Sequence, residues 1–224
     1  AMEVAPDKLL QVCESLLPSG VAPQYLRERD QASELFDHER LQVANFAEKR
    51  RQEFRAGRCC ARRALAELGV EACAIPSGPD RAPDWPDGIV GSISHCEDHA
   101  VAVVARQDAC RGIGVDLEAR DRVGADVWSQ IATGSERDAL ARLSVSASRE
   151  QATRLFSSKE AFYKAQFQVT GGWLGFQDAS VVFDGSAFEL TLSVDVESLA
   201  SRGTIFRGEH RYIAGCVLSL VWIP

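Results

Sequence analysis

Two short motifs carry the residues of this sequence that are best suited to chemistry. The first spans residues 155–164, Leu-Phe-Ser-Ser-Lys-Glu-Ala-Phe-Tyr-Lys, and helical spacing puts Lys159, Glu160 and Lys164 on one face. Two of the four lysines of the chain occur here. Taken alone, the motif is explained equally well by a solvated helix with a Glu160–Lys164 ion pair, worth about 0.3–0.5 kcal/mol.

The second motif lies upstream, at residues 112–118, and reads Gly-Ile-Gly-Val-Asp-Leu-Glu. Alternation along a strand places Asp116 and Glu118 together on the face opposite the apolar residues. Two such carboxylates repel each other unless they face water at an exposed edge or share a cation. With Glu160 on a nearby helix, three carboxylates would supply the oxygen ligands that suit Mg²⁺, with Mn²⁺ as an alternative. The lysines and arginines around them suit a phosphate-bearing substrate.

Three better-known site types do not fit the same motifs. The Gly-x-Gly at residues 112–114 lacks the third glycine and the following helix of a dinucleotide fingerprint. No Gly-Lys-Ser/Thr sequence marks a phosphate-binding loop. Ser94 and His95 are neighbours on a predicted strand and so point to opposite faces, and no Gly-x-Ser-x-Gly surrounds them, which disfavours a serine hydrolase.

A long basic helix is predicted over residues 48–68, with Gly69 as its C-cap. One face carries an apolar stripe for packing. Another face gathers arginines at helical spacing, namely Arg51, Arg55, Arg58 and Arg62, with Arg50 beside them. A solvated basic face and an anion-binding face both explain this pattern.

The remaining elements come from periodicity and turn residues. We expect a short helix over residues 9–17 and a proline- and glycine-rich loop over 77–88. A mostly helical polar region follows over 119–150. Strands are expected over 70–76, 89–95, 100–105, 114–118, 179–183, 188–194 and 212–222, with 89–95 and 100–105 as a hairpin. Helix-rich segments followed by strands occur twice, which indicates two α+β halves meeting near residue 110.

Composition is that of an ordinary globular protein, with 46% hydrophobic and 25% charged residues. The net charge of −7 argues against bulk nucleic-acid binding. Seven cysteines, an odd number without Cys-x-x-Cys spacing, favour free thiols in a reducing cytoplasm over a zinc site or disulfide framework. No run of about 20 apolar residues predicts a membrane span.

The two motifs together resemble the paired signature of 4′-phosphopantetheinyl transferases. Three upstream pieces agree in order, namely Phe54-Arg-Ala-Gly-Arg-Cys-Cys-Ala-Arg62, Arg81-Ala-Pro-Asp-Trp-Pro86 and Gly91-Ser-Ile-Ser-His95. They resemble the Sfp-type subgroup and its enterobactin-synthase-component-D-like branch, over roughly residues 45–185. The resemblance implies an α+β fold of two similar α/β subdomains related by pseudo-twofold symmetry, with the active site at their junction. Residues 1–110 would bind the nucleotide of coenzyme A, and residues 111–224 would carry the metal site and signature helix.

Roles for individual residues follow from the same resemblance. Three carboxylates would hold Mg²⁺, and one of them would act as general base, directly or through a metal-bound water. Two lysines would lie near the pyrophosphate, where one would stabilise the leaving phosphate. The implied set is Asp116, Glu118 and Glu160 for the metal, with Glu160 as base; Lys159 and Lys164 for the pyrophosphate, with Lys164 on the leaving group; Ser94 and His95 for the phosphates; and Arg50, Arg58 and Arg81 for the nucleotide. Phe156 stands where many relatives carry tryptophan, which should affect packing rather than chemistry.

The implied reaction transfers the phosphopantetheine arm of coenzyme A to a serine of an apo acyl or peptidyl carrier protein and releases 3′,5′-ADP. Such carriers serve fatty-acid, polyketide, nonribosomal peptide and siderophore synthesis. The enzyme would be a cytoplasmic monomer, and residues 119–150 with the start of the signature helix would dock the carrier. Two alternatives are a non-catalytic module that binds coenzyme A or a carrier, and a Mg²⁺-dependent pyrophosphate hydrolase.

Overall fold

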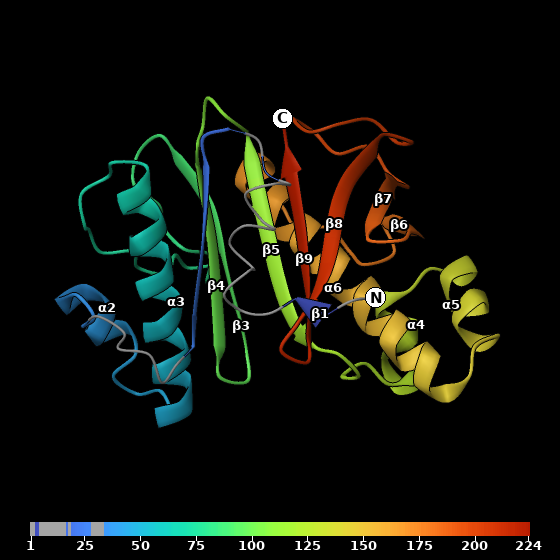
Figure 1. Ribbon diagram of the computed structural model, residues 1–224. Helices are drawn as coiled ribbons and strands as arrows, with labels where there is room; N and C mark the ends of the chain where they lie inside the picture. The colour runs from blue at the N-terminus through green and yellow to red at the C-terminus, as the bar shows by residue number, and fades with distance from the viewer. Residues whose placement is uncertain (1–2, 5–16, 18, 28–33) are drawn as a thin grey trace.

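Two β-sheets lie side by side in the computed structural model, and a long helix packs against each (Figure 1). The structure describes residues 3–4, 17, 19–27 and 34–224. The smaller sheet has the order β2-β4-β3, and the larger has the order β5-β9-β8-β7-β6 with β1 added beside β8. These two α/β halves agree with the α+β class predicted from the sequence.

The first half is built on the basic helix. Its strands are β2 (Val21–Arg27), β3 (Ile89–Cys96) and β4 (His99–Arg106), and its helices are α2 (Asp37–Gln42) and α3 (Glu48–Glu67). Strands β3 and β4 form the predicted hairpin. Small buried residues of α3, including Ala61 and Ala64, let the helix lie close to β2 and β4. Gly69 follows the helix with φ of +73°, a conformation that favours glycine, as expected for a C-cap.

The second half contains most of the remaining elements. Its strands are β5 (Gly112–Ala119), β6 (Ala179–Asp184), β7 (Ala187–Leu192), β8 (Ile205–Ile213) and β9 (Cys216–Ile223), joined by β1 (Glu3–Val4). A 3-10 turn η2 (Ala125–Val127) and the helices α4 (Trp128–Ile131), α5 (Gly134–Ala141) and α6 (Val145–Thr170) complete it. The parallel pairing of β1 with β8 brings the start of the chain into this half, which the sequence did not indicate.

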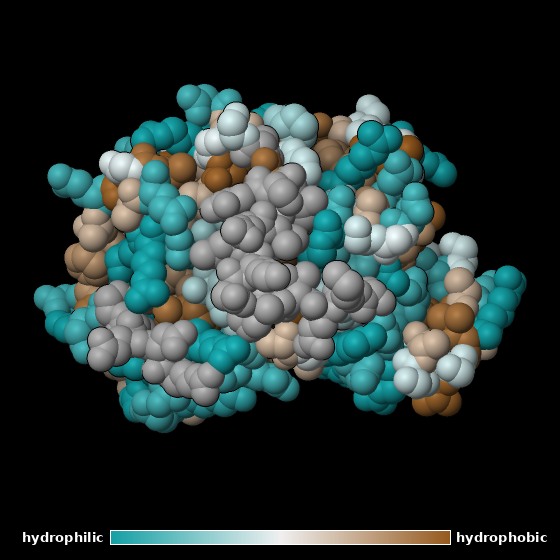
Figure 2. All heavy atoms as spheres, in the orientation of Figure 1, coloured by the Kyte–Doolittle hydropathy of each residue, from teal (hydrophilic) through white to brown (hydrophobic). Residues whose placement is uncertain are grey.

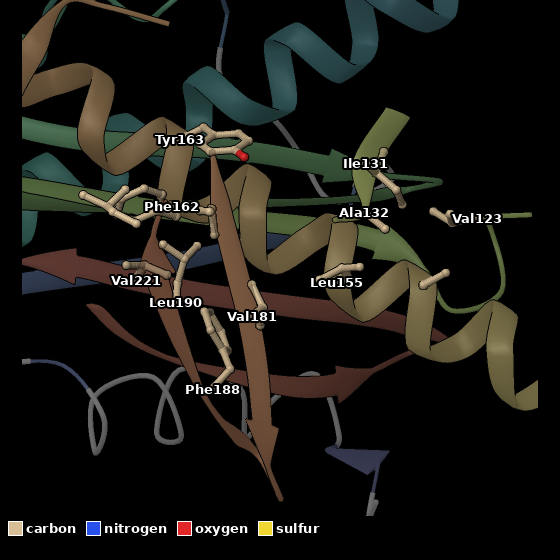
Figure 3. Close-up of a cluster of buried hydrophobic side chains, with 14 of the residues drawn as sticks. Val123, Ile131, Ala132, Leu155, Phe162, Tyr163, Val181, Phe188, Leu190 and Val221 are labelled. Atoms are coloured by element: carbon tan, nitrogen blue, oxygen red, sulfur yellow. The ribbon is translucent and has the colours of Figure 1, made fainter. Parts of the chain in front are cut away.

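Helix α6 extends well beyond the predicted residues 155–164. The Ser144 hydroxyl accepts a hydrogen bond from the Ala147 N–H at its start, and Gly171 ends it with φ of +64°. One side of α6 covers the apolar cluster shown in Figure 3, where Phe162 meets Leu190 and Val221. This cluster anchors the helix over β6, β7 and β9.

Two glycines decide how closely α6 approaches β5. A Cβ atom at Gly114 would lie 1.8 Å from the carbonyl oxygen of Ala161, and one at Gly112 would lie 2.3 Å from that of Ala165. Any larger residue would push the helix away from the strand. The Gly-x-Gly that precedes the carboxylates therefore brings the signature helix against them.

Three expectations need correction or fall outside the description. Residues 70–76 form no strand, and only an isolated bridge joins Ser77 to Pro83. Residues 212–222 are not one strand but parts of β8 and β9, joined by Ala214 and Gly215 with φ of +49° and +80°. Apart from Leu17, the helix expected over 9–17 lies outside the described residues.

In the part of the chain that the structure describes, no helix is long and apolar enough to cross a membrane.

Candidate active site

Side chains from both halves meet at Asp116, in the middle of β5. Asp116 is only 3% exposed, and its Oδ1 accepts hydrogen bonds from Lys164 Nζ at 2.7 Å and from Ser94 Oγ at 3.1 Å. Lys164 Nζ also donates to the Val115 carbonyl at 3.1 Å. The Leu117 N–H donates to Ser94 Oγ at 3.1 Å, which ties β3 of the first half to β5 of the second.

This network changes the role expected for Ser94. The hydroxyl is buried and has partners on β5 and α6, so it holds Asp116 and Lys164 rather than facing outward toward a phosphate. Ser94 therefore lies in the predicted site but as a connection between the two halves.

The charge of Asp116 acts on two further carboxylates, Glu118 and Glu160. Burial, together with the Asp116 charge, raises the pKa of Glu118, while a hydrogen bond from Arg122 lowers it. Burial also raises the pKa of Glu160, which the Lys164 charge opposes and the Asp116 charge reinforces. Among the described residues, no three acidic, cysteine or histidine side chains lie together in a group that could hold a metal ion.

The donor set nevertheless fits a hard cation. Asp116 Oδ2 is buried and has no hydrogen-bond partner among the described atoms, an arrangement that costs free energy. A divalent cation would satisfy this oxygen and would offset the repulsion of Asp116 from Glu118 and Glu160. Carboxylate oxygens are also the ligands that Mg²⁺ prefers.

A cavity of about 350 Å³ opens beside this network, between the two halves. Glu160 and Lys164 line it from α6, and Arg81 lines it from the loop before β3. Five aromatic residues also line it, namely Trp85, Tyr163, Phe167, Trp173 and Phe176. Gly91 makes room for one of these rings, because a Cβ there would lie 2.7 Å from the Trp85 ring. The cavity thus combines a charged end with apolar walls.

Arg50 and His95 meet near the other end of β3. Arg50 Nη1 lies 2.6 Å from His95 Nε2, and Glu53 contacts both side chains. Burial lowers the pKa of His95, and the charges of Arg50 and Lys164 lower it further while that of Glu53 raises it. Arg50 and His95 are therefore in direct contact and share the Glu53 carboxylate. The structure places these two residues of the predicted nucleotide site side by side.

Arg58 and Arg81 have different surroundings. Arg58 is buried, and it donates to the Ile75 carbonyl at 2.5 Å and to Ser77 Oγ at 3.0 Å, while burial lowers its pKa to about 10. It therefore braces the loop that carries Arg81. Arg81 has φ of +70°, which is uncommon outside glycine, and lines the cavity.

Lys159 does not lie where the sequence analysis placed it. It is fully buried, and its Nζ donates to Glu136 Oε2 at 2.8 Å and to the carbonyls of Ile131 and Phe176 at 3.1 and 2.7 Å. Burial lowers the pKa of Lys159, which Glu136 opposes. Three acceptors use all three ammonium donors, and Lys159 is enclosed in the core rather than lining the cavity that Lys164 lines. Phe156 stacks on Phe176 at 5.5 Å, the packing role expected for it.

Sequence reasoning missed two functional contributors. Gln168, one turn beyond Lys164, accepts from the Gly91 and Ile113 N–H groups and donates to the Ile113 carbonyl, linking β3 to β5. The sequence could have indicated Gln168 only through its position four residues after Lys164, on the same face of the helix. Glu136 forms a capping box with Thr133, a pattern that the sequence analysis did not use, and it also holds Lys159.

Comparison with known proteins bears on both halves. Residues 37–105 match the family model of the 4′-phosphopantetheinyl transferase N-terminal domain, and residues 112–216 match that of the 4′-phosphopantetheinyl transferase superfamily. The chain is 38% identical to the 4′-phosphopantetheinyl transferase Npt of Nocardia iowensis, over 78% of this chain and 79% of the relative. It is also 38% identical to PptT of Mycobacterium tuberculosis, over 80% and 82%.

The chain belongs to the 4′-phosphopantetheinyl transferase family. It is an enzyme that transfers the phosphopantetheinyl arm of coenzyme A to carrier proteins, as the motifs indicated. Enterobactin synthase component D of Salmonella typhi is 40% identical over a smaller share, 57% of this chain and 52% of the relative. This transferase therefore shares longer matches with Npt and PptT than with the enterobactin components.

Proposed function

We propose that phosphopantetheinyl transfer takes place where the cavity between the halves meets Asp116, Glu160 and Lys164. The observation that carries this proposal is the ion pair of Lys164 with Asp116, at 2.7 Å, beside a cavity that Lys164, Glu160 and Arg81 line. The pyrophosphate of coenzyme A would lie beside Lys164 and Arg81. Arg50 and His95 would hold the 3′-phosphate, with Arg58 bracing the loop that carries Arg81.

The aromatic walls support a place for the pantetheine arm. The arm is a slender chain with amides and apolar carbons, and a cavity of about 350 Å³ lined by Trp85, Tyr163 and Phe167 would exclude water around it. The phosphate that joins the arm to the nucleotide would then lie at the charged end, beside Lys164.

Mg²⁺, with Mn²⁺ as an alternative, would be held by Asp116, Glu118 and Glu160. When bound, it would supply positive charge against the negative charge that develops during phosphoryl transfer. The residues of the chain would do the remaining work. Glu160 would accept the proton of the carrier serine, and Lys164 would stabilise the leaving 3′,5′-ADP through its ammonium group.

The carrier would be a small acidic acyl or peptidyl carrier domain of polyketide, nonribosomal peptide or siderophore synthesis. Exposed apolar side chains at the α5–α6 connection, Leu143 and Val145, offer a contact surface, and Figure 2 shows hydrophobic atoms at this end of the molecule. We propose that the carrier docks there, and that the enzyme acts as a cytoplasmic monomer.

The experiment that tests the site is intact mass measurement on a panel of apo carrier domains with coenzyme A and Mg²⁺. The wild-type protein should add one phosphopantetheine arm, and EDTA should abolish the gain. Asp116→Asn should reduce transfer by at least about 10³-fold, because it removes the charge at the centre of the site. Asp184→Asn, at an exposed carboxylate of β6, is the matched control and should transfer normally.

Other outcomes distinguish the alternatives. Full activity of Asp116→Asn would contradict the proposed site. Coenzyme A binding without transfer to any carrier would favour a binding module, and release of 3′,5′-ADP without a carrier would favour a pyrophosphate hydrolase.

A further inference from the structure

The loop that carries Arg81 is closed on itself at its base. An isolated antiparallel bridge pairs Ser77 with Pro83, and the Gly78 N–H donates to the Ala82 carbonyl at 2.8 Å. The Arg81 N–H donates to the Gly78 carbonyl at 3.0 Å. Arg81 therefore lies at the tip of a compact loop, and its position depends on what holds the base at Ser77.

One side chain of α2 holds this base. Gln42 Nε2 donates to the Ser77 carbonyl at 2.9 Å, and the Ser77 N–H donates to Gln42 Oε1 at 2.8 Å. Both backbone groups of Ser77 are thus bonded to a single amide. Glutamine suits this position because its planar amide offers a donor and an acceptor side by side.

Two buried side chains hold Ile75, just before the loop. The Ile75 N–H donates to Glu39 Oε1 at 2.8 Å, and Arg58 donates to the Ile75 carbonyl. Glu39 is fully buried and pairs with Arg62 at 2.8 Å, so these contacts belong to the core. Gln42 is exposed, and its replacement therefore tests the hold on the loop without opening the core.

We propose that Gln42 is a positioning residue for coenzyme A, which holds the loop so that Arg81 stays on the wall of the cavity. Arg81 and Trp85 line this cavity, whereas Gln42 contacts the base of the loop on its other side. The φ of +70° at Arg81 costs free energy outside glycine and persists only where the surroundings hold it. The inference rests on the proposed function, in which Arg81 lies beside the pyrophosphate.

The first test asks whether Gln42 holds the loop, and it needs no activity. Gln42→Ala removes both bonds to Ser77, so amide hydrogen exchange over residues 77–83 of the free enzyme should become at least about 5-fold faster. Gln52→Ala is the matched control, because Gln52 is an exposed glutamine that bonds to Glu48 on its own helix at 3.0 Å. Exchange that is no faster in Gln42→Ala than in Gln52→Ala would overturn the proposal.

The second test measures substrate binding and turnover. Gln42→Ala should raise the Kd and KM for coenzyme A roughly 5-fold and leave kcat unchanged, because Gln42 contacts no reacting group. Calorimetry without a carrier should show the same loss for dephospho-coenzyme A, which keeps the pyrophosphate. A fall in kcat at unchanged KM, or a loss confined to coenzyme A with its 3′-phosphate, would overturn the proposal.

A double variant separates this inference from the proposed function. In an Arg81→Ala background, Gln42→Ala should cause no further loss of affinity, because the residue through which Gln42 acts is already gone. A full further loss there would overturn the role of Gln42 while leaving that of Arg81 intact. If Arg81→Ala alone binds coenzyme A as the wild-type protein does, the proposed role of Arg81 is wrong, and the inference falls with it.

Discussion

Lys159 and Lys164 lie five residues apart on α6, yet their surroundings differ in every respect that matters for function. Lys159 is fully buried and gives its three hydrogen bonds to Glu136 and two carbonyls on one side of the helix. Lys164 is partly exposed, reaches across to Asp116 on β5 and lines the cavity between the halves. The first lysine is therefore enclosed in the core, whereas the second lies on the wall of the cavity, where its ammonium group contacts Asp116, Ser94 and the Val115 carbonyl.

The comparison shows that residue type and spacing do not separate support from chemistry. Both ammonium groups pair with a carboxylate, at 2.8 and 2.7 Å. The difference is that Asp116 keeps a second oxygen without a partner, whereas Glu136 uses its other oxygen to accept the Val181 N–H at 2.7 Å. Unsatisfied polar atoms, rather than ion pairs as such, indicate where a ligand is expected.

The sharpest test of the structural lysine is Lys159→Met. It leaves Glu136 buried without its cation, so the free energy of unfolding should fall by about 3–5 kcal/mol. Urea unfolding would measure this loss, and transfer per folded molecule should stay near the wild-type value. Adding Glu136→Gln should restore part of the stability. A variant that is stable but inactive would instead show that Lys159 acts in catalysis.

His210 extends the comparison to a buried group that has no ion partner. Its Nδ1 has no hydrogen-bond partner among the described atoms, and burial, with the charges of Arg154 and Arg211, lowers its pKa to about 4. The unfolded chain binds the proton near pH 6.5, so stability should fall as the pH drops from 6.5 to 4, by about 3 kcal/mol in total. The stability of His210→Phe should not show this loss between pH 6.5 and 4. If the unfolding free energies of the wild-type protein and of His210→Phe depended on pH in the same way, His210 would not be a buried neutral imidazole.

Lys164→Ala tests the other lysine. Removing a cation that acts mainly in the transition state should lower kcat by about 10²-fold, with a smaller change in the KM for coenzyme A. Carrier modification followed by mass measurement would give both constants. Lys164→Arg should recover part of kcat. A rise in KM at unchanged kcat would show that Lys164 only binds the substrate.

The smallest effect is expected at the Arg50–His95 end of the site. Arg50→Ala should weaken coenzyme A binding by roughly 10-fold but should affect dephospho-coenzyme A much less, because the latter lacks the 3′-phosphate. Calorimetry with both ligands would show the difference. Arg51→Ala, which removes the neighbouring arginine paired with Glu48, is the control. Equal weakening for both ligands would place Arg50 elsewhere on the nucleotide.

Much of the fold was predictable because its local signals are strong. The hairpin of β3 and β4 followed from two apolar runs, and α3 followed from its stripe and from Gly69. The strand predicted over residues 70–76 is absent, because the β-branched and apolar residues there pack without a partner strand. The turn between β8 and β9 was not predicted, because it consists of Ala214 and Gly215 and only the glycine is a typical turn residue.

The sequence by itself determined the chemistry of the family: two carboxylates on one strand face, a third on a helix, and two glycines that let the helix approach. Tertiary structure alone decided which lysine lies at the cavity, because helical spacing sets only the angle of a residue around the helix axis. Whether a lysine side chain then contacts Glu136 in the core or Asp116 at the cavity depends on which elements pack on each side of α6. The same reason hid Gln168, since its contacts join α6 to two strands that lie far away in the chain.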